Sequence, residues 1–223
     1  MKANEKDTFS PGTTDITLSR MGLGTWAIGG GPAWNGDLDR QICTDTILEA
    51  HRCGINLIDT APGYNFGNSE AIVGQALKKL PREQVVVETK CGGTGNEKEV
   101  YSTKLAIGSC IKTFPGIYPR RGKSGCQRLG IDYIDIYMTH WQSVPPFFTP
   151  IAETVAVLNE LKAEGKIRAI GAANVDADHI REYLQYGELD IIRRNTVSST
   201  GQWKTNCCRY VVIMALWFRL FPR

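Results

Sequence analysis

The chain has 223 residues, of which 42% are hydrophobic and 22% are charged. This composition is that of a globular protein and excludes a disordered or fibrous one, and the length suggests one domain or two small ones. The formal net charge of +3 is too close to neutral to indicate a nucleic-acid partner. Residues 193–223 hold six of the 26 basic residues and none of the 23 acidic ones, so the body of the chain is mildly acidic and its tail is basic.

Cysteine usage and hydropathy predict a cytoplasmic protein. The seven cysteines are odd in number, form no C-x-x-C pair and include the adjacent Cys207 and Cys208, which favours reduced thiols in a reducing compartment. The first seven residues contain no apolar run typical of a signal peptide. The longest apolar run, residues 210–218, has nine residues and is too short to span a bilayer, so no membrane contact is expected.

The first part of the chain alternates between strand and helix patterns. Short apolar runs predict strands, and apolar residues spaced near 3.6 positions apart predict helices between them. In chain order the predicted elements are a strand at 22–28, a helix that Asp39 caps and Gly54 ends, a strand at 56–59, a helix that Asn68 or Ser69 caps and Pro81 ends, and a strand at 85–90.

The same alternation resumes after residue 127. The predicted elements there are a strand at 132–138, a helix at 150–164, a strand at 167–170, a helix at 176–186 and a strand at 189–192. Strands that alternate with helices indicate parallel β/α units. The fold class is therefore α/β, with six parallel strands in all.

Two segments break this alternation. Residues 92–126 have no steady period and carry seven glycines and two prolines, and residues 193–223 lose both the helical pattern and acidic residues. The predicted organisation is a β/α body at 12–192 with an aberrant insert at 92–126, followed by a tail at 193–223 without native structure. Because both segments begin abruptly, we interpret them as stretches read out of frame, a hypothesis that reading the gene in its other frames tests.

Four polar residues, Asp59, Tyr64, Lys90 and His140, stand at or just after the ends of predicted strands. Active residues of parallel β/α folds gather at the carboxyl ends of strands. A buried lysine favours the phenolate of a neighbouring tyrosine, an aspartate anchors the lysine charge, and a histidine can orient a carbonyl group. Such a group would let Tyr64 donate a proton to a carbonyl oxygen while a hydride reaches the carbonyl carbon.

Each of these residues also has an ordinary structural interpretation. Asp59 would then be a turn residue, Tyr64 a loop aromatic, Lys90 a solvated side chain and His140 a hydrogen-bonded residue at a strand end. Catalysis is favoured because four compatible groups fall on three neighbouring strands. The three histidines have no metal-ligand spacing, so no metal site is predicted.

The motifs around these residues resemble those of the aldo/keto reductases. Residues 54–74 resemble the first signature of that family, and residues 87–90 resemble its lysine strand. Residues 129–141 resemble its histidine strand, and residues 161–174 resemble its cofactor strand. Within the family, the sequence is most similar to bacterial enzymes that reduce small aldehydes such as methylglyoxal.

The resemblance implies a (β/α)8 TIM barrel, of which about six strands are recognisable in this chain. It also implies NAD(P)H-dependent reduction of small aldehydes or ketones to alcohols. It assigns Tyr64 as the proton donor, Asp59 and Lys90 as the pair that tunes it, and His140 as the group that orients the substrate.

The resemblance further implies where NADPH or NADH would bind. The nicotinamide would lie near Gly24, Thr25 and Trp26, and Asn174 would hold its carboxamide. Trp26 and Trp141 would line the substrate mouth, although core packing is an equally good interpretation of both.

The sequence departs from the family pattern where the tail begins. Arg193 and the residues after it stand where the family has a glutamine and then a tyrosine that stacks on the nicotinamide. In addition, Ala173 stands where the family has a serine before Asn174. A tail of this length cannot supply strands seven and eight, so we expect an unclosed barrel and weak or absent NAD(P)H binding. The alternative function is an inactive remnant, or a barrel fragment that binds a partner through its open edge.

Overall fold

The computed structural model describes residues 8–12, 14–34, 36, 38–91, 125–142 and 149–193. Most of the predicted insert and of the predicted tail lies outside these ranges, and the expectations for those segments stay predictions. Two boundaries nevertheless move. Gly125 and Cys126, which the sequence assigns to the insert, begin a short helix, and Arg193, which it assigns to the tail, ends a strand.

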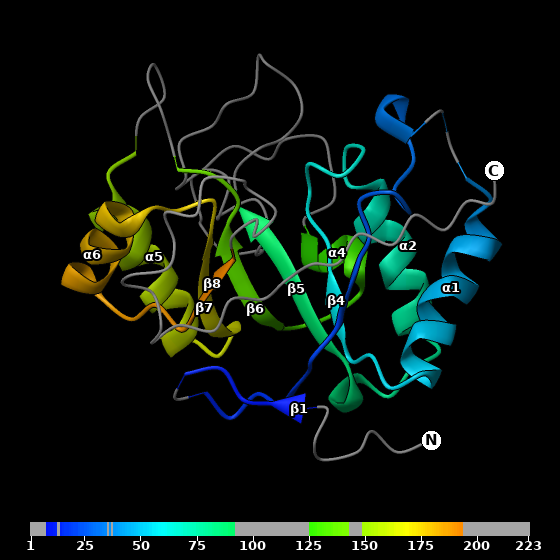
Figure 1. Cartoon of the computed structure of the whole chain (residues 1–223), viewed down its shortest axis with the longest axis horizontal. Coiled ribbons are helices and arrows are strands. Elements are labelled where there is room, and N and C mark those ends of the chain that lie inside the picture. Colours follow the sequence, from blue (N-terminus) through cyan, green and yellow to red (C-terminus); the bar gives the residue numbers. More distant parts are fainter. Residues whose placement is uncertain are drawn as a thin grey trace.

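Six parallel strands form one curled sheet (Figure 1). The strands are β3 (Gly22–Gly24), β4 (Leu57–Asp59), β5 (Val86–Cys91), β6 (Ile134–Thr139), β7 (Ile167–Ala173) and β8 (Ile191–Arg193). Each strand pairs in parallel with the next one along the chain. Within the described residues β3 and β8 do not pair with each other, so the sheet is the incomplete barrel that the sequence predicts.

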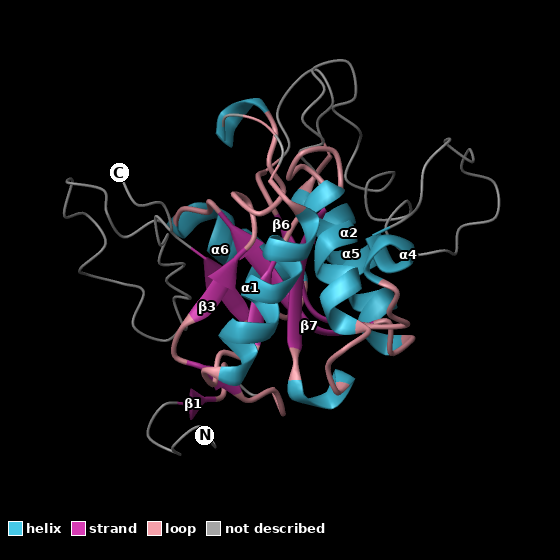
Figure 2. Cartoon of the chain, turned by 90° about the vertical axis from the view of Figure 1, so that its right-hand side faces the viewer, coloured by secondary structure: helices cyan, strands magenta, loops and turns pink. Residues whose placement is uncertain are grey.

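Helices cover the outer face of this curled sheet, as Figure 2 shows from the side of α1. They are α1 (Arg40–Arg52), α2 (Asn68–Leu77), α4 (Gly125–Leu129), α5 (Ile151–Ala163) and α6 (Ala177–Tyr186). Helix α2 contacts both α1 and α4, whereas α5 contacts α6 and β7. Two single-turn helices, η2 (Pro32–Trp34) and η3 (Arg82–Gln84), lie in the connections.

The predicted cap of α1 by Asp39 is confirmed and that of α2 is not, while α6 has a cap that was not predicted, Asp176. The carboxylates of Asp39 and Asp176 each accept two backbone N–H bonds at the start of α1 and α6. Helix α2 instead starts after Gly67, which has a φ of 82° and offers no side-chain cap. The prediction that Asn68 or Ser69 caps α2 is therefore wrong, because both lie inside its first turn and the Ser69 hydroxyl bonds to a threonine hydroxyl of another segment.

Side chains along the strands alternate between the interior of the half-barrel and its helix-covered face. In β5, Val86 belongs to the interior apolar cluster and Val87 to the cluster beneath α1 and α2. Because side chains alternate with a period of two residues, Glu88 and Lys90 also point toward the interior. Polar groups near the carboxyl ends of the strands thus share one concave space.

A hairpin that the sequence did not predict covers the end of the interior where the strands begin. Strand β1 (Thr8–Phe9) pairs in antiparallel fashion with β2 (Leu18–Ser19), and it lies at that end of the sheet in Figure 1. The Leu18 side chain is 0% exposed and packs in one cluster with Leu57, the first residue of β4. Strands of two residues are too short to show a periodicity in the sequence.

The first and last predicted strands also have different bounds. Strand β3 ends at Gly24 rather than at residue 28, because residues 26–29 form a turn. Strand β8 begins at Ile191 rather than at Leu189. The remaining strands and helices overlap their predicted ranges.

Among the described residues, no helix is both long enough and apolar enough to cross a membrane. The same part of the chain contains no group of three metal-ligating side chains. The cysteines that it contains are all free thiols, namely Cys43, Cys53, Cys91 and Cys126.

Candidate active site

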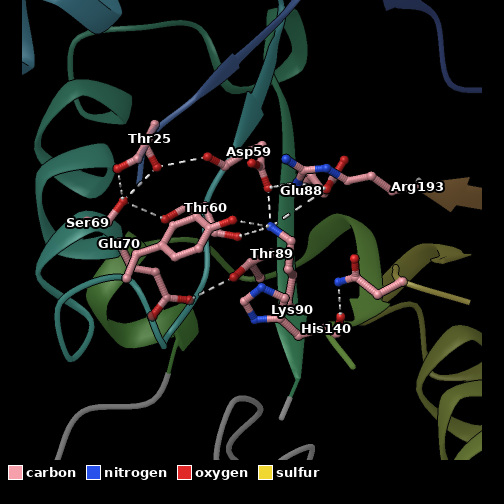
Figure 3. A network of polar contacts seen from close by, with 12 residues as sticks. Thr25, Asp59, Thr60, Ser69, Glu70, Glu88, Thr89, Lys90, His140 and Arg193 are labelled. Atoms are coloured by element: carbon pink, nitrogen blue, oxygen red, sulfur yellow. Dashed lines mark hydrogen bonds and ion pairs between the residues drawn. The ribbon is translucent and has the colours of Figure 1, made fainter. Parts of the chain in front are cut away.

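Asp59, Lys90 and His140 lie together at the carboxyl ends of the strands (Figure 3). The fourth residue predicted for catalysis, Tyr64, contacts Lys90. Asp59 ends β4, Lys90 lies near the end of β5, and His140 directly follows β6. Tyr64 comes from the loop after β4 and its side chain is buried, with 7% exposed. Parallel strands bring their carboxyl ends to one edge, so this clustering follows from the strand order.

Lys90 is the centre of the site, and its side chain is 1% exposed. Its ammonium group donates to Asp59 Oδ1, to the Thr60 carbonyl oxygen at 2.9 Å and to the Tyr64 hydroxyl at 3.2 Å. Three acceptors match the three donors of an ammonium group. Burial is the largest effect and lowers the pKa of Lys90, but the charges of Asp59, Tyr64 and Glu88 together outweigh it and leave the pKa above its ordinary value, so the lysine is charged.

The Tyr64 phenol is held between two aromatic rings. The Trp26 ring stacks on it at 6.2 Å between centroids, and the His140 ring meets it edge-on at 5.8 Å. Burial and the charge of Asp59 raise the pKa of Tyr64 above its ordinary value of 10, while Lys90 acts in the opposite direction. Lys90 therefore has the expected sign, but the net shift of the pKa is upward and the Tyr64 phenol is protonated at pH 7.

His140 is neutral in this site. Burial, together with the nearby Lys90 charge, lowers the pKa of His140 to about 4, because both disfavour a second positive charge. Its buried Nδ1 has no hydrogen-bond partner within the described residues. The amide of Asn174 donates to the His140 carbonyl oxygen at 2.8 Å, which fixes the backbone that carries the ring.

The loop that carries Tyr64 is fixed by its own backbone and side chains. Asn65 and Phe66 follow Tyr64 with φ angles of 47° and 52°, a left-handed conformation that costs free energy in non-glycine residues. The Asn65 amide donates to the Gly29 carbonyl oxygen at 2.9 Å, and the Asn68 amide donates to the same oxygen at 2.8 Å. These bonds hold the phenol in place before any substrate arrives.

The residues predicted to contact a cofactor or substrate lie beside the four residues of this site. The Thr25 hydroxyl donates to the Asp59 carbonyl oxygen at 2.8 Å and also contacts the Ser69 hydroxyl, so this side chain is part of the framework. Trp26 and Trp141 are 39% and 64% exposed, which excludes core packing as the interpretation of Trp141. Gly24 ends β3 beside Asp59.

Two charged residues of the site were missed by the sequence analysis, Glu88 and Arg193. Glu88 pairs in register with Asp59 across β4 and β5. Arg193 Nη1 lies 2.6 Å from Asp59 Oδ1 and 3.1 Å from Glu88 Oε1. The alternation of β5 would have found Glu88, since it precedes the inward Lys90 by two positions. No sequence pattern predicts Arg193, because it stands where the alternation of strands and helices ends.

The carboxyl groups of Glu88 and Asp59 have pKa shifts of opposite sign. Burial raises the pKa of Glu88 to about 7, and the adjacent Asp59 charge adds to that shift. Burial also acts to raise the pKa of Asp59, but the charges of Lys90 and Arg193 outweigh it and hold that pKa below its ordinary value. Asp59 is thus the charged partner of the ammonium.

Comparison with known sequences gives consistent results. The model of the aldo/keto reductase family matches residues 20–197. The chain is 81% identical over 183 residues to the NADH-specific methylglyoxal reductase of Escherichia coli strain K12, an alignment that covers 82% of the chain and 56% of that relative. It is 38% identical over 183 residues to the aldo-keto reductase YhdN of Bacillus subtilis strain 168, covering 81% of the chain and 50% of the relative.

Solved structures give the same result. The glycerol dehydrogenase of Gluconobacter oxydans superposes with a TM-score of 0.68 at 34% identity, covering 86% of this chain and 55% of that one. The chain spans about half the length of the curated relatives it matches, which agrees with a half-barrel of six strands. Because the family model extends over residues 20–197 and the folds superpose, the chain belongs to the aldo/keto reductase family.

Proposed function

We propose that this chain carries the reaction site of an NAD(P)H-dependent reductase that converts small aldehydes or ketones, such as methylglyoxal, to alcohols. The observation that carries the proposal is the bond of 3.2 Å from the Lys90 ammonium to the Tyr64 hydroxyl, with Asp59 as the counter-ion. The name of the Escherichia coli relative supports methylglyoxal as the first substrate to test and NADH as the first cofactor. Free thiols at four described cysteines support action in the cytoplasm.

Tyr64 supplies the proton of this reaction. As the carbonyl oxygen gains negative charge, the phenol donates its proton, and the Lys90 ammonium stabilises the phenolate that remains. His140, with its pKa near 4, is a neutral hydrogen-bond donor at pH 7 and orients the carbonyl oxygen. The phenolate then recovers a proton from water.

The residues beside Tyr64 and His140 fit the nicotinamide end of the cofactor. The unpartnered Nδ1 of His140 needs a polar group that a bound molecule would bring. The backbone at Gly24 and Thr25, the exposed Trp26 ring and the Asn174 amide would hold the nicotinamide. When bound, NADH or NADPH supplies the hydride for the carbonyl carbon.

The test is the NADH- and NADPH-dependent reduction of methylglyoxal by the full chain. We expect Tyr64→Phe to lower the rate by about 100-fold, since general acid catalysis contributes about that much. Tyr186→Phe is the matched control, because Tyr186 lies on α6 with 46% of its side chain exposed. Equal rates for the parent and Tyr64→Phe would contradict the role of Tyr64.

Thermal unfolding with and without cofactor distinguishes a reductase from an inactive remnant. A cofactor that binds only the folded chain raises the unfolding midpoint. A midpoint that saturating NADH and NADPH both leave unchanged, together with no turnover, would favour the inactive or partner-binding alternative.

A further inference from the structure

Four charged side chains form a closed ring inside the half-barrel (Figure 3). Asp59 Oδ1 bonds to the Lys90 ammonium and lies 2.6 Å from Arg193 Nη1. Arg193 Nη1 lies 3.1 Å from Glu88 Oε1, which in turn lies 3.8 Å from Lys90 Nζ. When the Glu88 carboxyl is ionised, positive and negative charges alternate around this charge ring of Asp59, Lys90, Glu88 and Arg193.

The charge ring is buried. The exposed fraction of its side chains is 4% for Asp59, 1% for Lys90, 0% for Glu88 and 12% for Arg193. Buried charges are stable only when they are paired. Without the arginine, two carboxylates on paired strands would share one ammonium group.

The arginine also decides which acceptors are left for the lysine. The Lys90 ammonium has three hydrogens, and they go to Asp59, the Thr60 carbonyl oxygen and Tyr64. Its contact with Tyr64, at 3.2 Å, is longer than that with Thr60, at 2.9 Å. Glu88, at 3.8 Å, is the next acceptor, and Arg193 Nη1 contacts this carboxylate at 3.1 Å as well as Asp59 at 2.6 Å.

We propose that Arg193 is a positioning residue of the Tyr64 site, because it neutralises Glu88 and so keeps the Lys90 ammonium directed at the phenol. The inference rests on the proposed function for its catalytic meaning, but the charge coupling itself exists without a cofactor. Through this charge coupling, Arg193 on β8 acts on the Tyr64 phenol, which follows β4.

The electrostatic consequence is a coupled titration of the phenol. A cation near a tyrosine favours the phenolate, and an anion disfavours it. Arg193 lowers the pKa of Tyr64 against the larger upward effects of burial and Asp59. The titratable groups that face this space are Asp59 from β4, Tyr64 from the following loop, Glu88 and Lys90 from β5, His140 after β6, and Arg193 from β8.

Fluorine NMR of the full chain labelled with meta-fluorotyrosine tests the proposal. The label makes the phenol more acidic, so that it titrates where the protein stays folded, and the signal missing in Tyr64→Phe identifies Tyr64. We expect Arg193→Gln to raise the titration midpoint of this signal by about one pH unit. Glu88→Gln removes a negative charge from the same ring and should shift the midpoint downward.

Two further variants distinguish an electrostatic effect of Arg193 on Tyr64 from a merely structural role of Arg193. Arg193→Lys retains the positive charge and should bring the midpoint back toward that of the parent. Arg168→Gln is the matched control, since Arg168 pairs with Asp135 and Asp15 outside the charge ring, and it should leave the Tyr64 signal unchanged.

The outcomes separate this inference from the proposed function. Unchanged Tyr64 titrations in both Arg193→Gln and Glu88→Gln, or an equal shift in Arg168→Gln, overturn the inference even if the parent reduces methylglyoxal. If Arg193→Gln does not fold, the Tyr64 titrations of Glu88→Gln and Arg193→Lys still test the inference. Opposite shifts in the two ring variants support the inference even if the parent shows no turnover.

Discussion

Glu88 is buried and His140 is half-buried in the same interior, and burial disfavours the charged form of both side chains. Burial raises the pKa of Glu88 from 4.5 to about 7, and burial lowers the pKa of His140 from 6.5 to about 4. Their effects on stability have opposite signs. Folded Glu88 binds its proton more tightly than in the unfolded chain, so its contribution is complete below pH 4.5 and is lost as the pH rises toward 7. His140 contributes above pH 6.5 and loses its contribution as the pH falls toward 4.

We therefore predict that Glu88→Gln changes the pH dependence of the free energy of unfolding. The parent loses the Glu88 contribution between pH 4.5 and 7, and the variant does not, so the difference between them should grow in favour of the variant over this range. Urea unfolding at several pH values measures it. Glu83→Gln, on the exposed η3 turn, is the control, and parallel curves for parent and Glu88→Gln would refute the shifted pKa.

At the scale of elements, Asp135 ties three neighbouring segments together. Its carboxylate accepts from the Val87 backbone N–H at 2.9 Å, from Arg82 at 2.6 Å and from Arg168 at 2.8 Å. These bonds join β6 to β5, to η3 and to β7. The side chain is 1% exposed, so the carboxylate depends on these partners.

Asp135→Asn should lower the free energy of unfolding by about 2 kcal/mol, less than the loss of about 3 to 5 kcal/mol for a fully buried ion pair, since both arginines are partly solvated. Asp178→Asn removes a carboxylate from an exposed ion pair with Arg181 and should change stability by about 0.5 kcal/mol or less. Urea denaturation of both variants compares them. Similar losses would show that Asp135 is no more than a surface charge.

Elements with a clear sequence pattern were predictable, and those held by tertiary contacts were not. The periodicity of α5 and the cap of α1 by Asp39 act within a few residues of the chain. The start of α2 depends instead on Ser69 bonding to Thr25, which is distant in sequence. Likewise, Lys90 could be predicted from its strand end, whereas the reach of Arg193 across the interior depends on how the whole sheet curls.

At the scale of the whole molecule, the strand order could be predicted because alternating strands and helices impose it, but the hairpin that closes the interior could not. We predict that Leu18→Ala, which removes a fully buried side chain from this closure, lowers the free energy of unfolding by about 3 kcal/mol. Leu184→Ala is the control, because Leu184 on α6 is 43% exposed. If chemical denaturation gives equal losses, the hairpin does not seal the interior.

The sequential order of the sheet has a consequence for how the protein is made. Because every strand from β4 to β8 pairs with the strand before it, a chain leaving the ribosome amino end first always finds its partner strand already synthesised. The contact of Arg193 with Asp59 and Glu88 is different, since it spans nearly the whole sheet. It can form only after β8, the last of these six strands along the chain, has been synthesised.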